Sequence, residues 1–214
     1  MGNLMGLTEL KLGTLAMSQA PLAAAAIALL PSLRLLELVG EPVLYLDEPY
    51  DELEGIDYGP AMALAQMLPL PRLESLVLWT PLFEDDNPVL CEGLRQMPLL
   101  KRLELHGTFV GFESKGIEDL IDAVSQLTAL THLELGYLNC GEDFDDVVTP
   151  QLTTLTGLRH LGVSRSYLED WGSFGACLAL LTNLTSLDIG HQGCTEPLSP
   201  SRCKQDGGLY FVRP

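Results

Sequence analysis

The chain has 214 residues, 46 of them leucine, and it carries 12 Lys and Arg against 29 Asp and Glu, which gives a formal net charge of -17. The length fits one domain or one modest array of repeats, and a hydrophobic content of 47% is enough to bury a core. The acidic excess argues against nucleic acid and against a membrane surface as partners, because both of these anionic surfaces attract positively charged proteins.

The first long apolar run, residues 21–31, resembles the core of a signal peptide in composition. It begins late, lacks a basic flank and is bounded by Pro21 and Pro31, and it is too short to span a bilayer. We therefore expect a buried helix in this segment.

Seven segments of the chain carry the motif L-x-x-L-x-L or a close variant, beginning at residues 7, 33, 73, 100, 130, 158 and 184. The intervals between them are 26, 40, 27, 30, 28 and 26 residues, and a period this regular indicates an internal repeat. In a strand, the two leucines of L-x-L point to the same face. Each motif is therefore predicted to form a strand with one buried face.

Helical patterns lie between the strands, at residues 60–68, 88–96, 116–126, 145–155 and 172–181. Asn87 and Pro88 fit a helix N-cap followed by proline at the first helical position. Strands joined by helical crossovers form a parallel sheet with the helices on one face. Because strands stack about 4.8 Å apart and packed helices about 8–10 Å apart, the sheet is expected to curve with its strands on the concave side.

The motifs, clearest in residues 127–135 and 181–189, give the chain a pattern that resembles the leucine-rich repeat family over about residues 4–190. The period is closest to the ribonuclease-inhibitor-like class, with about seven divergent repeats. The resemblance implies an α/β leucine-rich repeat solenoid with helices on the convex face. Five residues after the second leucine of the motif, the family usually has Asn or Cys. This chain has other residues there, so we expect less regular loops. They are Leu15, Glu41, Pro81, Thr108, Leu138, Ser166 and Gln192.

We divide the chain into a repeat array over residues 1–194 and an irregular C-terminal tail or makeshift cap over residues 195–214. The long second interval holds an acidic insertion at about residues 41–58, which is expected to form a surface loop.

Five cysteines are present, an odd number without C-x-x-C spacing. Cys91 and Cys177 fall in apolar helical patterns, where a free thiol behaves as a small hydrophobe. We therefore expect a reduced, intracellular protein, placed in the cytoplasm, and leave open a disulfide between Cys194 and Cys203.

Candidate functional residues are those that flank the inward leucines, because they point out of the strand face. All four histidines fall on or beside this face, and two aromatic residues there are possible anchors for a partner. The alternative is that exposed strand positions simply tolerate such residues. The predicted partner-binding set is Glu37, Trp79, Arg102, Glu104, His106, His132, Glu134, Tyr137, His160, Arg165 and Asp188.

Acidic clusters at residues 84–86, 142–146 and 169–170 follow the strands, and equivalent repeat positions stack, so we expect an acidic rim. Such a rim would attract a basic partner protein, although acidic residues also stabilise helix N-termini. His132 and His160 are expected on adjacent strands near Glu104 and Glu134, but neighbouring strands bring side chains close without a metal. We therefore predict no metal site and no cofactor.

No phosphate-binding loop, nucleophile elbow or zinc-protease motif occurs in the chain, so we predict no enzymatic activity. The favoured function is a non-catalytic scaffold that binds a partner protein with a basic patch, on the concave face or the acidic rim. The alternative is a fragment of a larger repeat protein, such as a ubiquitin-ligase substrate adaptor, an immune-type sensor or a cytoskeletal or ciliary factor, with no separate function. The sequence leaves the oligomeric state open.

Overall fold

The computed structural model of the protein describes residues 4–15, 20–40, 70–79, 82–83, 87–106, 109–110, 114–136, 144–164, 171–189 and 209–212. The insertion at 41–58, the predicted helix at 60–68 and most of the tail lie outside these ranges. None of the helices within these ranges has the length and apolar character that a membrane span requires.

Every predicted L-x-L segment forms a strand. The seven parallel strands are β1 (Glu9–Leu15), β2 (Leu35–Gly40), β3 (Ser75–Trp79), β5 (Arg102–His106), β7 (His132–Gly136), β8 (His160–Ser164) and β9 (Ser186–Ile189). They join in chain order into one sheet, and β10 (Leu209–Val212) pairs antiparallel with β9 at its C-terminal edge. A second, two-stranded parallel sheet pairs β4 (Leu82–Phe83) with β6 (Phe109–Val110).

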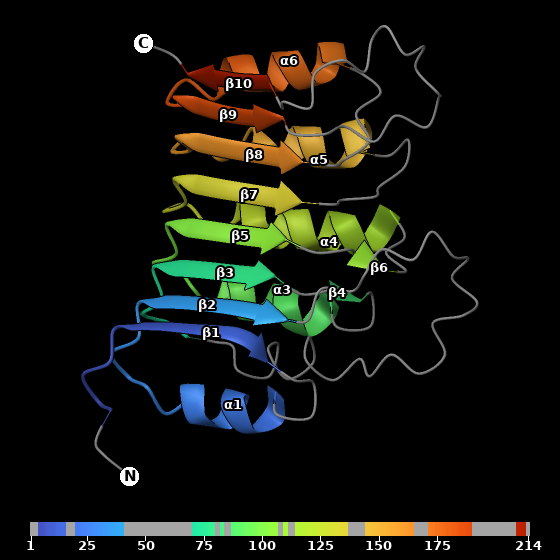
Figure 1. Ribbon diagram of the computed structural model, residues 1–214. Coiled ribbons are helices and arrows are strands. Elements are labelled where there is room, and N and C mark those ends of the chain that lie inside the picture. The colour runs from blue at the N-terminus through green and yellow to red at the C-terminus, as the bar shows by residue number, and fades with distance from the viewer. Residues whose placement is uncertain are drawn as a thin grey trace, which may run out of the picture.

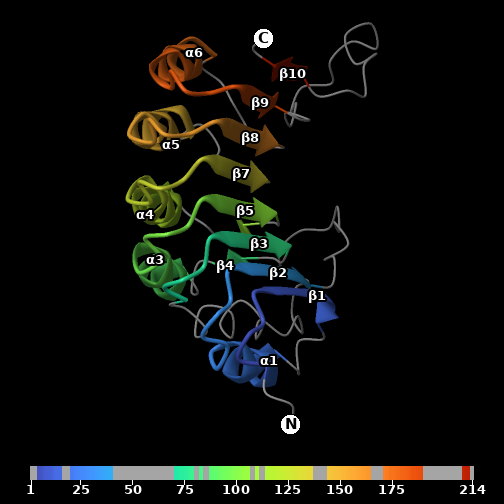
Figure 2. The same ribbon diagram turned by 90° about the vertical axis from the view of Figure 1, so that its left-hand side faces the viewer.

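The described helices are α1 (Ala20–Ile27), α3 (Asn87–Arg95), α4 (Ser114–Ser125), α5 (Phe144–Leu152) and α6 (Trp171–Leu180). Helices α3 to α6 form a second layer against one face of the sheet, whereas α1 lies at the N-terminal end of the stack, below β1 (Figures 1 and 2). The last four match predicted helices to within three residues at each end. Strands on one side and helices on the other, repeated along one axis, make the α/β solenoid that the repeat predicts.

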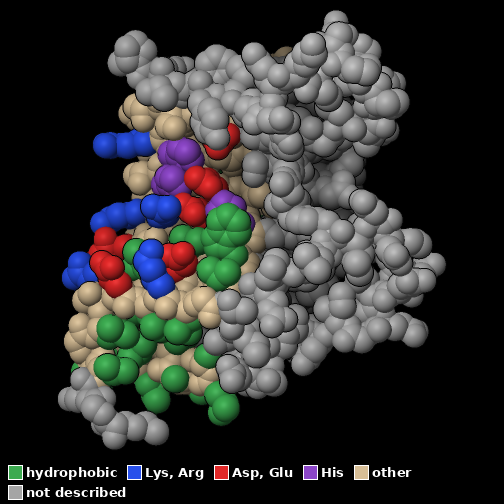
Figure 3. Space-filling view, in the orientation of Figure 1, with side chains coloured by type: hydrophobic (Ala, Val, Ile, Leu, Met, Phe, Trp, Pro, Cys, Tyr) green, Lys and Arg blue, Asp and Glu red, His purple; other side chains and the backbone are tan. Residues whose placement is uncertain are grey.

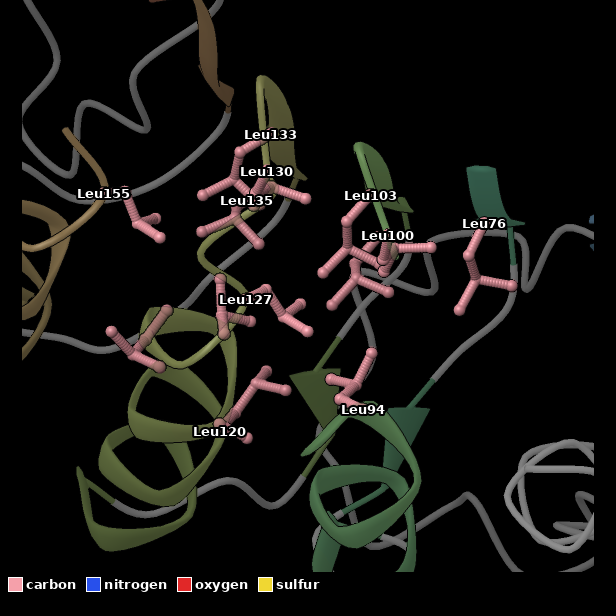
Figure 4. Close-up of a cluster of buried hydrophobic side chains, with 14 of the residues drawn as sticks. Leu76, Leu94, Leu100, Leu103, Leu120, Leu127, Leu130, Leu133, Leu135 and Leu155 are labelled. Atoms are coloured by element: carbon pink, nitrogen blue, oxygen red, sulfur yellow. The ribbon is translucent and has the colours of Figure 1, made fainter. Parts of the chain in front are cut away.

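The core lies between the two layers and is made mostly of leucine. The strands pair in register, so that Leu76, Leu103, Leu133 and Leu161 occupy equivalent positions on successive strands. The inward-facing residues of β2 through β8 are at most 2% exposed. Leu94 and Leu120 reach this cluster from α3 and α4 (Figure 4).

A tight turn precedes every motif, and from the third strand onward this turn begins at a buried residue. Its backbone hydrogen bond joins a buried residue to the first leucine of the motif three residues later, for example from the amide of Leu130 to the carbonyl of Leu127 at 2.9 Å. The equivalent pairs are Leu70 and Leu73, Met97 and Leu100, Leu155 and Leu158, and Leu181 and Leu184. The repeat therefore includes a further buried position, three residues before the first leucine of the motif.

Asn87 does not have the role that the sequence predicts. It is buried, its side-chain amide donates a 2.6 Å hydrogen bond to the carbonyl of Gly116 on the neighbouring helix, and its Oδ1 accepts from the Cys91 thiol at 3.2 Å. Proline at the next position still fits the start of α3. Asn87 thus ties two successive repeats together.

Helix α1 is buried on one side only, which corrects the expectation of a buried helix. Ala24 and Ile27 are buried against the core, whereas Leu22, on the helix, and Leu29, just beyond its end, are largely exposed.

Candidate functional site

The flanking positions of the motif align in three rows on the face of the sheet opposite the helices. The central row runs through Glu37, Val77, Glu104, Glu134, Gly162 and Asp188, and the strand register places each beside the next. Histidine, acidic and basic side chains gather over the middle strands of this face (Figure 3). We define the strand-face cluster by the residues that β3, β5, β7 and β8 bring together there: Trp79, Arg102, Glu104, His106, His132, Glu134 and His160.

Glu104 lies at the centre of the strand-face cluster and is only 5% exposed. Its carboxylate accepts a 2.6 Å hydrogen bond from Arg102 Nε and also pairs with Arg102 Nη2. The Nε2 atoms of His132 and His106 lie 2.9 and 3.1 Å from its two oxygens. The prediction of an outward-pointing Glu104 is therefore corrected in one respect, because these neighbours cover the carboxylate that a partner was expected to contact.

Glu134 forms the second centre. Its Oε1 lies 3.1 Å from His160 Nε2 and 3.3 Å from His132 Nε2, and its Oε2 lies 3.4 Å from His106 Nε2. The three histidines of the described chain thus converge on two carboxylates.

Two stacked ring pairs border these centres. Trp79 stacks on His106, with ring centroids 4.0 Å apart and 21° between the planes, and His132 stacks on His160 at 4.1 Å and 9°. Trp79 nevertheless remains 47% exposed. The stack therefore fixes the orientation of a large aromatic surface that is still accessible to solvent.

Gly162 makes room for this arrangement. A Cβ atom at this position would lie 2.8 Å from Glu134 Cγ, a separation that real Cβ atoms do not show. Because position 162 has no side chain, Glu134 leans from β7 over β8 and reaches His160. The sequence marks this position as a glycine in a row otherwise made mostly of charged residues, but it does not show which neighbour fills the space.

The hydrogen bonds of the cluster change the acidity of its groups. Burial alone would raise the pKa of Glu104, but hydrogen bonds from His106 and His132 and the charge of Arg102 outweigh it and hold that pKa well below its usual range. Hydrogen bonds from His132 and His160 lower the pKa of Glu134 to about 2. Burial would lower the pKa of His132, but its hydrogen bonds with Glu104 and Glu134 prevail and raise it.

The remaining predicted residues do not join the cluster. Val77 separates Glu37 from Glu104, and Glu37 instead forms a 2.6 Å ion pair with Lys11 on β1. Asp188 lies beyond Gly162, and its Oδ1 is buried without a hydrogen-bond partner in the described structure. Tyr137 and Arg165, the acidic clusters at 84–86 and 169–170, and Cys140, Cys194 and Cys203 fall outside the described residues.

Several contacts on the strand face were not predicted from the sequence. Ser186 Oγ lies 3.0 Å from His160 Nδ1, on the side of the ring away from Glu134. Two overlapping groups of side chains have ligand atoms close enough to hold a metal ion, within 4.8 Å of one another: His132, Glu134 and His160, and Glu104, His106 and Glu134. Adjacency in the sheet predicts that these residues are neighbours, but not that their ligand atoms converge.

No family model matches the chain, and no curated protein matches it. Among solved structures, it is similar to an internalin (inlF) from Listeria monocytogenes, with 20% identity, a TM-score of 0.52, and coverage of 92% of this chain and 46% of that one. An internalin C2 (inlC2) from the same organism has 18% identity and a TM-score of 0.49, with coverage of 94% of this chain and 69% of that one. Leiomodin-1 actin-binding site 2 has 14% identity and a TM-score of 0.46, with coverage of 84% and 81%.

The chain spans less than half the length of the inlF internalin. At this level of identity the likeness concerns the fold. Together with the in-register parallel strands and the single helical layer, it establishes that this chain has an α/β leucine-rich repeat fold.

Proposed function

We propose that this protein is a non-catalytic scaffold that binds a partner protein on the strand-face cluster. The observation that supports it best is Trp79, a half-exposed aromatic side chain held in place on His106 beside two buried or half-buried carboxylates. Rigid aromatic side chains next to fixed polar groups are typical of the residues that dominate protein interfaces.

The charge of this face favours a partner with a basic patch. The chain as a whole is strongly acidic, with a formal net charge of -17, so a basic protein would be attracted from a distance. Within the cluster, Arg102 offsets one of the two carboxylates, and Glu134 remains about 29% exposed in its side chain. Glu134, rather than the covered Glu104, is the acidic group that a basic side chain would meet.

We also propose a reducing, intracellular setting. Cys91 and Cys177 are free and buried, and burial raises the pKa of each thiol to about 11. Buried thiols of this kind serve as hydrophobic packing groups, as is usual in proteins that do not depend on disulfides.

The test is affinity capture from the native cell with the wild-type chain, a Trp79→Ala variant and a Val89→Ala variant. Val89 is a matched control, because it is also about half exposed (45%) but lies on helix α3, away from the strand face. We expect Trp79→Ala to lose a partner that Val89→Ala retains, and Glu134→Gln to weaken the same complex more at low salt than at high salt. A partner captured equally by all variants at every salt concentration would place the interface elsewhere.

A further inference from the structure

We propose that His132, Glu134 and His160 bind one divalent transition-metal ion, with Zn²⁺ the best match, on the exposed face of strands β7 and β8. This inference does not depend on the proposed partner, because it concerns the chain and the metal alone.

The first argument is convergence of ligand atoms. His160 Nε2 and His132 Nε2 lie 3.1 and 3.3 Å from the same oxygen of Glu134, and the ligand atoms of all three residues fall within 4.8 Å of one another. Neighbouring strands bring backbones about 4.8 Å apart, but this spacing does not make the tips of long side chains meet at one point. Two imidazoles and one carboxylate, with a further position open to water, are a common ligand set for zinc.

The second argument is the support around His160. Ser186 Oγ, 3.0 Å from Nδ1, can accept a hydrogen bond from Nδ1–H once an ion replaces the Nε2 proton that now faces Glu134, and the Nε2 lone pair is then available to the ion. Histidines that bind metals usually donate their other ring nitrogen in this way, and such contacts fix both the tautomer and the ring.

The third argument is the space that Gly162 leaves. A Cβ atom there would meet Glu134 Cγ at 2.8 Å, so any other residue would require the Glu134 side chain to shift from its present position beside His160. The glycine therefore acts as a positioning residue for the carboxylate of the proposed site.

Binding requires a small rearrangement. The rings of His132 and His160 are nearly parallel, 9° apart, so a single ion cannot lie in both ring planes until the rings turn. Their side chains are 24% and 21% exposed, which leaves room for this rotation. The ion would also replace the hydrogen bond between His132 Nε2 and Glu104 Oε1, now 2.9 Å long.

The experiment is calorimetric titration of the chelator-treated full chain with zinc chloride, with cobalt(II) absorption as a second readout of coordination. We expect one ion per chain and a visible cobalt spectrum typical of nitrogen and oxygen ligands. His160→Ala and Glu134→Gln should weaken zinc binding about 10–100-fold or more, and Ser186→Ala and Gly162→Ala about 10-fold. Glu37→Gln is the matched control, because it lies in the same row but outside the cluster, and should bind as the wild type does.

Circular dichroism tests whether each variant is folded. If His160→Ala fails to fold, zinc binding by the isosteric Glu134→Gln and by the small change Ser186→Ala still tests the proposal. Absence of zinc binding to the wild-type chain would overturn the proposal. So would binding that survives both Glu134→Gln and His160→Ala, since the ion would then lie elsewhere. Binding lost in His106→Gln but kept in His160→Ala would also overturn it, in favour of the group formed by Glu104, His106 and Glu134.

Discussion

Replacing Glu104 by Gln tests whether the strand-face cluster stabilises the fold as a charged unit. The substitution keeps the shape of the side chain but removes its charge and one acceptor oxygen. Glu104 is 5% exposed and is bonded to Arg102, His106 and His132, so these contacts cannot all be replaced by water. We expect the variant to fold with a lower free energy of unfolding.

The size of the loss follows from the contacts. A hydrogen bond to a charged group contributes about 1.5–3 kcal/mol, and Gln retains one acceptor. The Arg102 side chain is 51% exposed, so solvent screens its part of the interaction. A net loss of about 1.5–3 kcal/mol is therefore expected at a pH where Glu104 and His132 are both charged.

The loss should depend on pH in a defined direction. The pKa of Glu104 is lowered from 4.5, so its contribution is present above about pH 4.5 and is lost as the pH falls toward the folded-state value. The pKa of His132 is raised from 6.5, so its contribution is complete below about pH 6.5 and is lost as the pH rises through the folded-state value. Both contributions are present together between these limits, and Glu104→Gln should cost most there.

The assay is urea unfolding followed by circular dichroism at pH 5.5 and pH 9, for the wild type and the variant. Glu37→Gln is the control, because its ion pair with Lys11 is partly exposed and should contribute less than about 0.5 kcal/mol at either pH. A loss below about 0.5 kcal/mol for Glu104→Gln at both pH values, or a larger loss at pH 9 than at pH 5.5, would refute this account of the cluster.

Three further predictions concern the core. Leu103→Ala should lower the free energy of unfolding, measured with urea, by about 2–5 kcal/mol, because Leu103 is fully buried. The control is Leu99→Ala: Leu99 is half exposed, so this change should alter the free energy of unfolding by less than about 0.5 kcal/mol. Asn87→Ala should cost about 1–3 kcal/mol by the same measurement, since it leaves the Gly116 carbonyl without its partner; a neutral result would mean that water replaces the amide. Cys91 and Cys177 should resist a thiol reagent at pH 8 in the folded protein and react once urea unfolds the chain, and mass spectrometry of their peptides measures both. Rapid labelling of the folded protein would contradict their burial.

Much of the fold could be predicted because leucine spacing and strand geometry are directly linked. The alternation in Leu103-Glu104-Leu105 determines which side chains face the helices, and the constant period determines which residues share a row across the sheet. The exact role of Asn87 could not be predicted in the same way. An Asn before a Pro fits a helix cap locally, but the carbonyl that it binds belongs to the next repeat, 29 residues away.

The candidate site shows where this kind of reasoning ends. Register predicts that Glu104, Glu134 and the three histidines are neighbours, and they are. It does not predict that Glu104 is covered while Glu134 is partly accessible, because that difference depends on the direction in which each long side chain leans. Arg102, His106 and His132 surround Glu104 from its own strand and from the next one, so its carboxylate is satisfied where it stands.

Glu134 leans differently because the next position in its row is Gly162, and the missing side chain opens a path toward His160. Gly162→Ala would require the Glu134 side chain to shift, and a shift toward β5 would bring it nearer to Glu104, whose carboxylate already lies 2.9 Å from His132 Nε2. The two carboxylates would then compete for the same imidazoles, and their repulsion would oppose the hydrogen bonds that now keep both charged. A single glycine thus separates two like charges along the row and lets the three histidines be shared between them, which is why the chemistry of this face depends on a residue that has no side chain.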